Sequence, residues 1–197
     1  GLRRTGWQVG LLDADVTGAS IPKLFGIHQP PLQDGTGGIL PVMTHGGIKI
    51  ISVNLLLERE DDAVIWRGPL ISKMIQQFWN DVIWGPLDAL IIDMPPGTSD
   101  AALTVLRDLP ITGVVLVTTP QDLADMIVRK AANMTRQVNK PVLGVVENMS
   151  YARCPHCGER FDLFGISHAD TLAAEFGAPF LGALGLEQSL AQAGDAG

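Results

Sequence analysis

Two cysteines stand close together in the second half of the chain, in the segment Cys154-Pro-His156-Cys157-Gly158. Two thiolates separated by two residues can bind one metal centre, and the following glycine lets backbone amides turn towards the sulfurs. Such zinc or iron–sulfur centres usually need four ligands, and the sequence has only 2 cysteines. We therefore expect two chains to share one site, with two thiolates from each. A zinc site completed within one chain by nitrogen ligands from His156 and His168, and a pair of inert surface thiols, are the alternatives.

Two acids follow the apolar segment Val9–Leu12, as Asp13-Ala-Asp15. A short, continuous apolar run is typical of a buried parallel strand, and ligands bind open α/β sheets at the carboxyl ends of such strands. Asp13 and Asp15 can point opposite ways from an extended chain, so that one faces a ligand while the other anchors the loop. The alternative is an acidic loop in which Asp15 or Ser20 caps the next helix.

A third acid, Asp93, ends the apolar segment Leu90–Ile92 and is followed by Met-Pro95-Pro-Gly97. A buried strand that ends in Asp is the Walker B pattern, in which the carboxylate holds Mg²⁺ through water. Pro95 and Gly97 force a turn whose amides can sense a terminal phosphate. The alternative is an ordinary strand-to-helix connection with Thr98 or Ser99 as the helix cap.

Asn148 follows another apolar segment, Val142–Val146, within Glu147-Asn148-Met-Ser150. An asparagine amide at a strand end can donate to and accept from the edge of a purine base. The alternative is a turn-forming asparagine.

Apolar strand-like segments alternate with amphipathic helical patterns along the whole chain. This order predicts a doubly wound, mostly parallel α/β sheet in one domain over residues 1–197, with a metal-binding loop at 150–160. A hairpin between Gly38–Val42 and Ile48–Val53 interrupts the alternation. The expected strands are Val9–Leu12, Leu87–Ile92, Gly113–Thr118, Val142–Val146 and Phe180–Ala183, and the expected helices are Leu70–Val82, Asp100–Asp108, Leu123–Val138 and Ala169–Phe176.

The composition excludes several classes of protein. The 14 basic and 21 acidic residues give a net charge of −7, which disfavours a nucleic-acid binder. No apolar run approaches the roughly 20 residues that span a bilayer, so we expect no membrane partner and a cytoplasmic location. Two cysteines do not make a disulfide scaffold.

The first six residues, Gly1-Leu-Arg-Arg-Thr-Gly6, have the pattern of a last helical turn, with cations near its end and Gly6 as the stop. No helix or strand precedes them. We therefore expect a chain truncated at its N-terminus, with a gap or strained pairing beside Val9–Leu12. A frayed N-terminal arm is the alternative.

Together these motifs resemble the Mrp-type (ApbC-like) iron–sulfur cluster carrier ATPases, which are P-loop proteins related to MinD and ParA. The motifs that carry the resemblance occur in the family's order: Leu11-Leu-Asp-Ala-Asp15, Trp66-Arg-Gly-Pro69, Asp93-Met-Pro-Pro-Gly-Thr98, Thr118-Thr-Pro-Gln-Asp122, Glu147-Asn-Met-Ser150 and Cys154-Pro-His-Cys157. The resemblance implies a homodimer that binds ATP and Mg²⁺ and carries a bridging 4Fe–4S cluster to apoproteins.

The resemblance also assigns roles to individual residues. Asp15 matches the acid that orients the attacking water, Asp93 the Walker B acid, and Asn148 an adenine contact. Cys154 and Cys157 match the cluster ligands. The family's glycine- and lysine-rich phosphate loop is absent from the sequence, so we do not expect this chain alone to hydrolyse ATP.

Two other functions remain as alternatives. A ParA- or MinD-like partitioning ATPase works on DNA or membrane, and the net charge of −7 and the cysteine pair argue against it. A non-enzymatic zinc-knuckle dimer needs only the cysteine pair. A degenerate phosphate loop upstream would favour this module.

Overall fold

The computed structural model describes residues 1–57 and 68–197, and the predicted Trp66-Arg67 segment lies outside the described residues. The chain divides into two compact units. The first unit comprises residues 1–95, 99–109 and 193–197, and the second comprises residues 96–98 and 110–192. Each is described by itself.

The sheet of the first unit is built around β1 (Val9–Asp13), which pairs in parallel with β5 (Lys49–Ile51) on one side and β6 (Ala89–Asp93) on the other. The strand β4 (Val42–Met43) adds antiparallel to β5, which gives the order β4-β5-β1-β6. Both edges of β1 are therefore filled by regular parallel pairing. The expected gap beside this strand was wrong.

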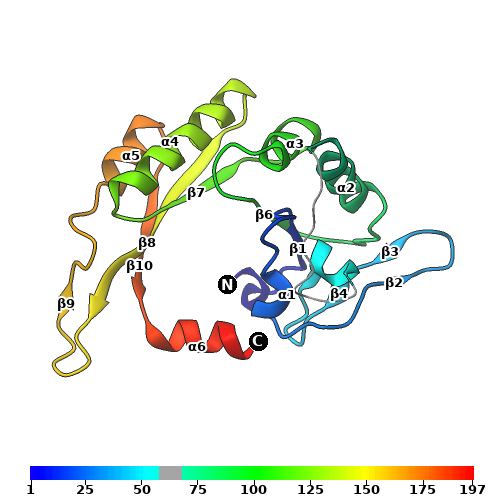
Figure 1. The fold of residues 1–197 in the computed structure, drawn as a ribbon, viewed down its shortest axis with the longest axis horizontal. Coiled ribbons are helices and arrows are strands. Elements are labelled where there is room, and N and C mark those ends of the chain that lie inside the picture. Colours follow the sequence, from blue (N-terminus) through cyan, green and yellow to red (C-terminus); the bar gives the residue numbers. More distant parts are fainter. Residues whose placement is uncertain (58–67) are drawn as a thin grey trace. The chain divides into compact units, whose positions relative to one another are not determined.

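Helices and a hairpin lie beside this sheet (Figure 1). Ser99 caps α3 (Asp100–Asp108) by accepting from the Ala102 N–H at 3.2 Å, and it is one of the two caps considered for this helix. Of the predicted hairpin, only β4 and β5 pair with each other, whereas Ile39–Leu40 pairs with Leu32–Gln33. The elements are the 3-10 turns η1 (Leu2–Thr5) and η2 (Val53–Leu56), the helices α1 (Ile21–Leu24), α2 (Gly68–Asn80) and α3 (Asp100–Asp108), and the strands β2 (Leu32–Gln33) and β3 (Ile39–Leu40).

The second unit contains a parallel sheet in the order β10 (Phe180–Leu186), β8 (Val142–Arg153), β7 (Val114–Thr118). The helices α4 (Asp122–Gln137) and α5 (Ala169–Glu175) pack on this sheet (Figure 1). The core between them contains Val128 and Ala132 from α4, Leu172 from α5, and Leu116 and Val145 from the sheet. The strands are β7 (Val114–Thr118), β8 (Val142–Arg153), β9 (Arg160–Phe161) and β10 (Phe180–Leu186), and α6 (Gln188–Ala196) follows them.

The observed elements confirm the predicted α/β class with mostly parallel strands. The largest difference is β8, which was expected to end at Val146 and instead continues to Arg153. Beyond the predicted segment it pairs with β10 on one side and, antiparallel, with β9. The single domain over residues 1–197 stays a prediction. In the part of the chain that is described, no helix is long and apolar enough to cross a bilayer.

Candidate functional site

Asp13 is the last residue of β1 and is fully buried. Its Oδ2 accepts from the Ser52 hydroxyl at 2.9 Å and from the Ile21 N–H at 3.4 Å, and its Oδ1 accepts from the Asp15 N–H at 3.2 Å. Burial, with a further contribution from the charge of Asp93, raises its pKa from 3.8 to about 6. Asp13 thus anchors the loop that follows β1.

Asp15 is half-buried and lies two residues beyond Asp13 in that loop. Its Oδ1 accepts from the Thr17 hydroxyl at 3.1 Å and from the Gly18 N–H at 3.0 Å. These bonds close a turn of the Asx kind, which fixes the carboxylate without burying it. Of the alternative helix caps, neither Ser20 nor Asp15 caps α1: Ser20 occupies the cap position without a side-chain bond.

Asp93 ends β6 and lies directly opposite Asp13 in the parallel register. Its side chain is exposed, and partial desolvation followed by the charge of Asp15 raises its pKa. The Ala14 N–H donates to the Asp93 carbonyl at 2.8 Å, which holds the two strand ends together. The structure therefore brings the three predicted acids of the first unit together at the carboxyl ends of β1 and β6, here called the acidic edge.

The turn after Asp93 contains the predicted residues Pro95 and Gly97. Gly97 has φ +75°, in the left-handed region that glycine adopts without steric cost, and Ser99 then begins α3. This turn leads the chain from the strand end into a capped helix. Its predicted role in phosphate sensing stays a prediction.

Asn148 belongs to the second unit and is half-buried within β8, rather than after a strand as expected. Glu147 pairs with Ala183 and Tyr151 pairs with Gly185, so β8 uses four residues where β10 uses two. The strand therefore bulges at Asn148, whose Oδ1 accepts from the N–H of Met149 at 2.9 Å. The bulge, and not a strand end, sets the position of this side chain.

Cys154 and Cys157 lie in the turn of the hairpin formed by β8 and β9, where Cys154 is half-buried and Cys157 is exposed. The Cys154 N–H donates to the Glu159 carbonyl at 2.8 Å, and the Gly158 N–H donates to the Cys154 carbonyl at 2.9 Å. Gly158 has φ +73°, which closes this turn. The N–H groups of Cys157 and His156, together with the Cys157 thiol, lower the pKa of Cys154. The turn thus favours the thiolate form that binds metals.

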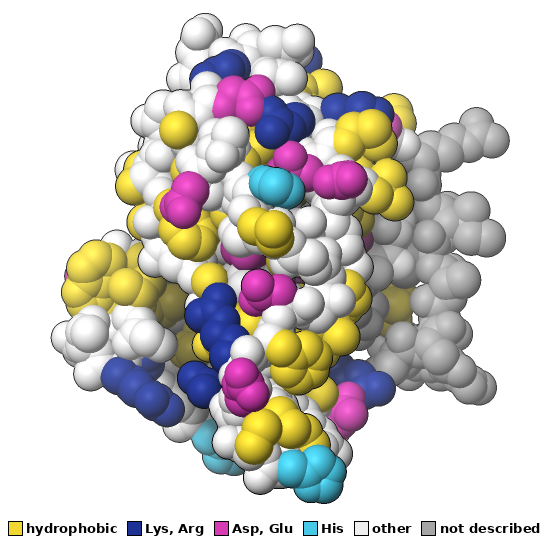
Figure 2. Space-filling view, turned by 90° about the vertical axis from the view of Figure 1, so that its left-hand side faces the viewer, with side chains coloured by type: hydrophobic (Ala, Val, Ile, Leu, Met, Phe, Trp, Pro, Cys, Tyr) yellow, Lys and Arg dark blue, Asp and Glu magenta, His cyan; other side chains and the backbone are white. Residues whose placement is uncertain are grey.

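Basic and aromatic side chains flank this hairpin. The guanidinium of Arg160 lies 3.9 Å from the centre of the Tyr151 ring, and that of Arg153 lies 5.8 Å from it. Figure 2 looks onto this side of the second unit, and hydrophobic side chains lie next to lysine or arginine side chains on its lower part, at the height of β9 in Figure 1. Phe161 and Ile166 are among the exposed apolar residues of this segment.

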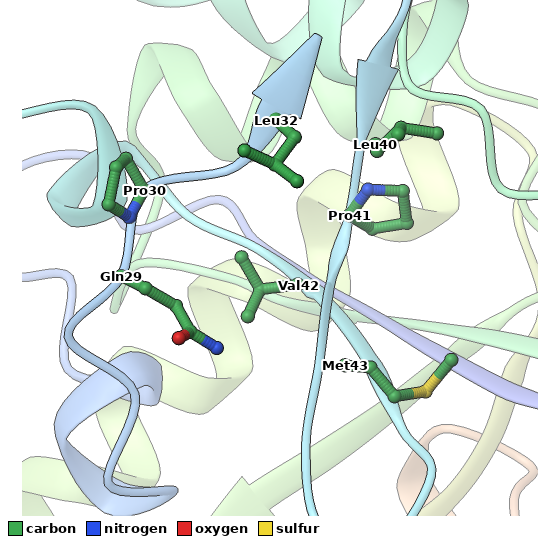
Figure 3. A pocket seen from close by; sticks show the side chains of 7 residues that line it. All are labelled: Gln29, Pro30, Leu32, Leu40, Pro41, Val42 and Met43. Carbon is green, nitrogen blue, oxygen red and sulfur yellow. The ribbon is translucent and has the colours of Figure 1, made fainter. Parts of the chain in front are cut away.

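Two further features bear on where ligands bind. Within residues 1–57 and 68–197, no group of three or more His, Cys, Asp or Glu side chains could hold a metal ion. A hollow of about 330 Å³ lies in the first unit beside β2, β3 and β4. Figure 3 shows that its lining is mostly apolar, with Gln29 as its polar member, and it contains no predicted site residue.

Sequence reasoning assigned no role to four hydrogen-bonding residues around the predicted ones. Ser52 holds Asp13, and the carboxyl group of the fully buried Glu147 binds the hydroxyls of Ser150 and Ser167. Glu147 carried the only available signal, because an acid at the end of an apolar run is unusual unless it has partners.

Comparisons with known proteins agree with this architecture. A family model described as ParA, NUBPL iron-transfer P-loop NTPase, matches residues 1–197. An "Iron-sulfur cluster carrier protein" from Methanocaldococcus jannaschii is 42% identical over 100% of this chain and 68% of its own length. A "Cytosolic Fe-S cluster assembly factor NUBP2 homolog" from Monosiga brevicollis is 44% identical over 98% of this chain and 69% of its own length.

A solved structure is also similar. It is a nucleotide-binding protein from Archaeoglobus fulgidus, in complex with ADP and with Co found by PIXE, and it has a TM-score of 0.84 at 42% identity. The match covers 99% of this chain and 76% of that one.

Fold and family model together place the chain in the P-loop class of α/β proteins. Within that class, the chain belongs to the NUBPL iron-transfer P-loop NTPase family. The predicted resemblance to iron–sulfur cluster carriers is thereby confirmed, and with it the predicted carrier function at the level of the family.

Proposed function

We propose that this chain carries an iron–sulfur cluster on Cys154 and Cys157 and shares that cluster with a second copy of itself. The observation that carries the proposal is the hairpin turn, which is closed by the Cys154–Glu159 and Gly158–Cys154 backbone bonds and holds both cysteines within four residues. The N–H groups of Cys157 and His156 also lower the pKa of Cys154. Amide groups around a sulfur stabilise the thiolate and tune a bound cluster. The exposed Cys157 leaves the site open to cargo and to client proteins.

The shared site follows from the number of ligands. Each chain has 2 cysteines, and its described residues form no group of three metal-binding side chains. A site with four thiolates then needs two hairpins related by a two-fold axis. Exposed apolar residues beside the hairpin, such as Phe161 and Ile166, are suited to an interface of this kind.

We propose the acidic edge of the first unit as the place where ATP and Mg²⁺ act. Mg²⁺ typically binds one or two protein carboxylates together with substrate phosphates and water. The half-buried Asp15 and the exposed Asp93 supply carboxylate oxygens that solvent can reach. A bound Mg²⁺ would neutralise charge on the phosphates. Asp15 would orient the attacking water, while Asp13 holds the loop that carries Asp15. A direct role for Asp13 or for the Asn148 amide in nucleotide binding stays a prediction.

The transfer function implies apoprotein clients that accept the cluster. Nucleotide-dependent movement of the loops after Asp15 and Asp93 would change the dimer and so its hold on the cluster. A cytoplasmic location is proposed by analogy with the relative that is named cytosolic.

Anaerobic reconstitution with iron and sulfide tests the proposal. Cys154→Ser and Cys157→Ser should each abolish bound iron and its visible absorbance, and His156→Ala should retain both because the histidine is not a ligand. Ultracentrifugation should show that metal loading and dimer formation occur together. Loaded monomers with one metal centre per chain would contradict the shared site, and loss of iron in His156→Ala would indicate a ligand set within one chain.

A further inference from the structure

Glu147 is an acid inside the core of the second unit, with a side chain that is 1% exposed. Its Oε2 accepts from the Ser150 hydroxyl at 2.5 Å, and its Oε1 accepts from the Ser167 hydroxyl at 2.8 Å. A buried carboxyl group is stable only when hydrogen bonds replace its hydration. Both of its oxygens have such a bond.

The first of these bonds braces the bulge of β8. Ser150 ends the bulge, and it also contacts the Glu147 carbonyl at 3.2 Å. Within the bulge Met149 has φ +55°, a conformation that non-glycine residues adopt only where their surroundings impose it. The contacts between Ser150 and Glu147 span this residue and hold the strand in the shape that leads to Cys154.

The second bond holds the segment that returns from the hairpin. After the cysteine turn the chain passes through β9 and reaches Ser167, which is 20 positions after Glu147. The Ser167 Oγ also accepts from the Ala169 N–H at 3.3 Å, at the start of α5. One carboxyl group therefore ties both the entering and the returning segments of the hairpin to the core.

We infer that Glu147 is a positioning residue that fixes the hairpin carrying Cys154 and Cys157, acting through Ser150 and Ser167. This inference rests on the proposed metal site, because Glu147 itself contacts no cysteine through these bonds. Cysteine ligands need a fixed separation. Groups bonded directly to a ligand typically contribute about 10- to 100-fold to metal affinity, so a group that acts through the backbone should contribute about 10-fold or less. A hairpin without these bonds would still have both thiols, but it would bind metal more weakly because their separation would no longer be fixed.

Titration of the chain with Co²⁺, followed by the thiolate-to-cobalt absorbance, tests the inference. Ser167→Ala is expected to weaken Co²⁺ binding measurably, by up to about 10-fold. Ser167→Thr keeps the hydroxyl and should restore binding to near the wild-type value. Ser99→Ala is the matched control, since it removes a comparable bond to a helix N–H in the first unit and should leave Co²⁺ affinity unchanged.

The outcomes separate this inference from the proposed function. Wild-type affinity in Ser167→Ala, with binding abolished in Cys154→Ser, would overturn the role of Glu147 and leave the metal site standing. Wild-type binding in Cys154→Ser would overturn both. Because Ser167 is exposed, the variant should fold, and an unchanged circular dichroism spectrum together with rescue by Ser167→Thr would support positioning rather than a general loss of structure.

Discussion

Strands β1 and β8 occupy equivalent places in the two units, because each is paired along both edges and each contains a fully buried acid. In β1 the acid is Asp13, and in β8 it is Glu147. A predicted site residue follows soon after each, the proposed catalytic acid Asp15 in the first unit and the proposed adenine contact Asn148 in the second. The two units therefore place a predicted site residue after a buried acid in the same way.

The surroundings of the two acids differ. Burial, and after it the negative charge of Asp93, raises the pKa of Asp13 to about 6, although Ser52 donates to it. Glu147 accepts from two hydroxyls, those of Ser150 and Ser167. β1 stops at its acid, whereas β8 continues to Arg153 and the cysteine hairpin. The first acid lies with Asp15 and Asp93 in a cluster of negative charge that a cation would stabilise, whereas the second is hydrogen-bonded by residues before and after the cysteine hairpin.

The largest expected effect concerns the acidic edge. In a preparation that hydrolyses ATP, Asp15→Asn should lower turnover by about 10²- to 10⁴-fold and leave nucleotide affinity nearly unchanged. Asparagine keeps the oxygen that accepts from the Gly18 N–H, so the loop should keep its shape. Single-turnover kinetics and equilibrium nucleotide binding measure the two quantities separately.

Asp34→Asn is the matched control for this prediction. Asp34 closes a similar turn in the same unit by accepting from the N–H groups of Thr36 and Gly38 at 2.8 and 2.9 Å. It lies between β2 and β3 and not at the acidic edge. Unchanged turnover in Asp15→Asn would remove Asp15 from the catalytic residues, and an equal loss in Asp34→Asn would point to loop stability instead.

The next effect is the pH dependence that Asp13 adds to stability. Its pKa is about 6 in the folded protein and 3.8 ordinarily, so the folded state binds this proton more tightly. The resulting stabilisation is complete below pH 3.8 and is lost as the pH rises through 6. It amounts to about 3 kcal/mol.

Urea denaturation of the wild type and Asp13→Asn across this pH range measures the effect. Relative to the variant, the wild type should lose about 3 kcal/mol between acid and neutral pH. A difference that stays constant with pH would show that Asp13 titrates normally.

The sequence was sufficient to predict the acids at the strand ends and the cysteine turn, because their signals are local. An acid after an apolar run marks the end of a strand, and two cysteines separated by two residues specify their own turn. The predicted helix Asp100–Asp108 is observed with those bounds, since Ser99 provides a local cap. These parts of the fold follow from neighbouring residues.

The partners of the buried acids could not be predicted in the same way. Ser52 lies 39 positions from Asp13, and Ser167 lies 20 positions from Glu147, so only tertiary structure brings them together. The bulge of β8 was missed because Met149 carries none of the glycine or asparagine signals of a positive φ. The apolar run also gave no sign that β8 continues beyond Val146, because its later pairing depends on distant β10 and β9.

A smaller effect separates the two acids by size. At neutral pH Asp13→Asn should destabilise the fold less than Glu147→Gln does, because removal of a buried charge beside Asp93 offsets part of the lost hydrogen bonds to Ser52 and Ile21. Glu147→Gln should destabilise it by about 1–2 kcal/mol, because the amide cannot accept from both hydroxyls. Urea denaturation of both variants at pH 7 measures this. Stabilisation by Glu147→Gln would mean that Glu147 is another unfavourable buried charge, and the distinction between the two strands would fail.

The smallest effect concerns the backbone of the bulge that Glu147 braces. Met149 has φ +55°, a left-handed conformation that costs a non-glycine residue about 1–2 kcal/mol, whereas glycine adopts it freely and loses about 0.5–1 kcal/mol in chain entropy. Met149→Gly should therefore raise the free energy of unfolding by about 0.5 kcal/mol or leave it unchanged.

Met43→Gly is the matched control, since this exposed methionine lies in β4 and has no positive φ. The Met43→Gly substitution should lower the free energy of unfolding by about 1 kcal/mol, because glycine weakens a strand. Equal destabilisation by the two substitutions, measured by urea denaturation, would show that the bulge imposes no strain and needs no brace from Glu147.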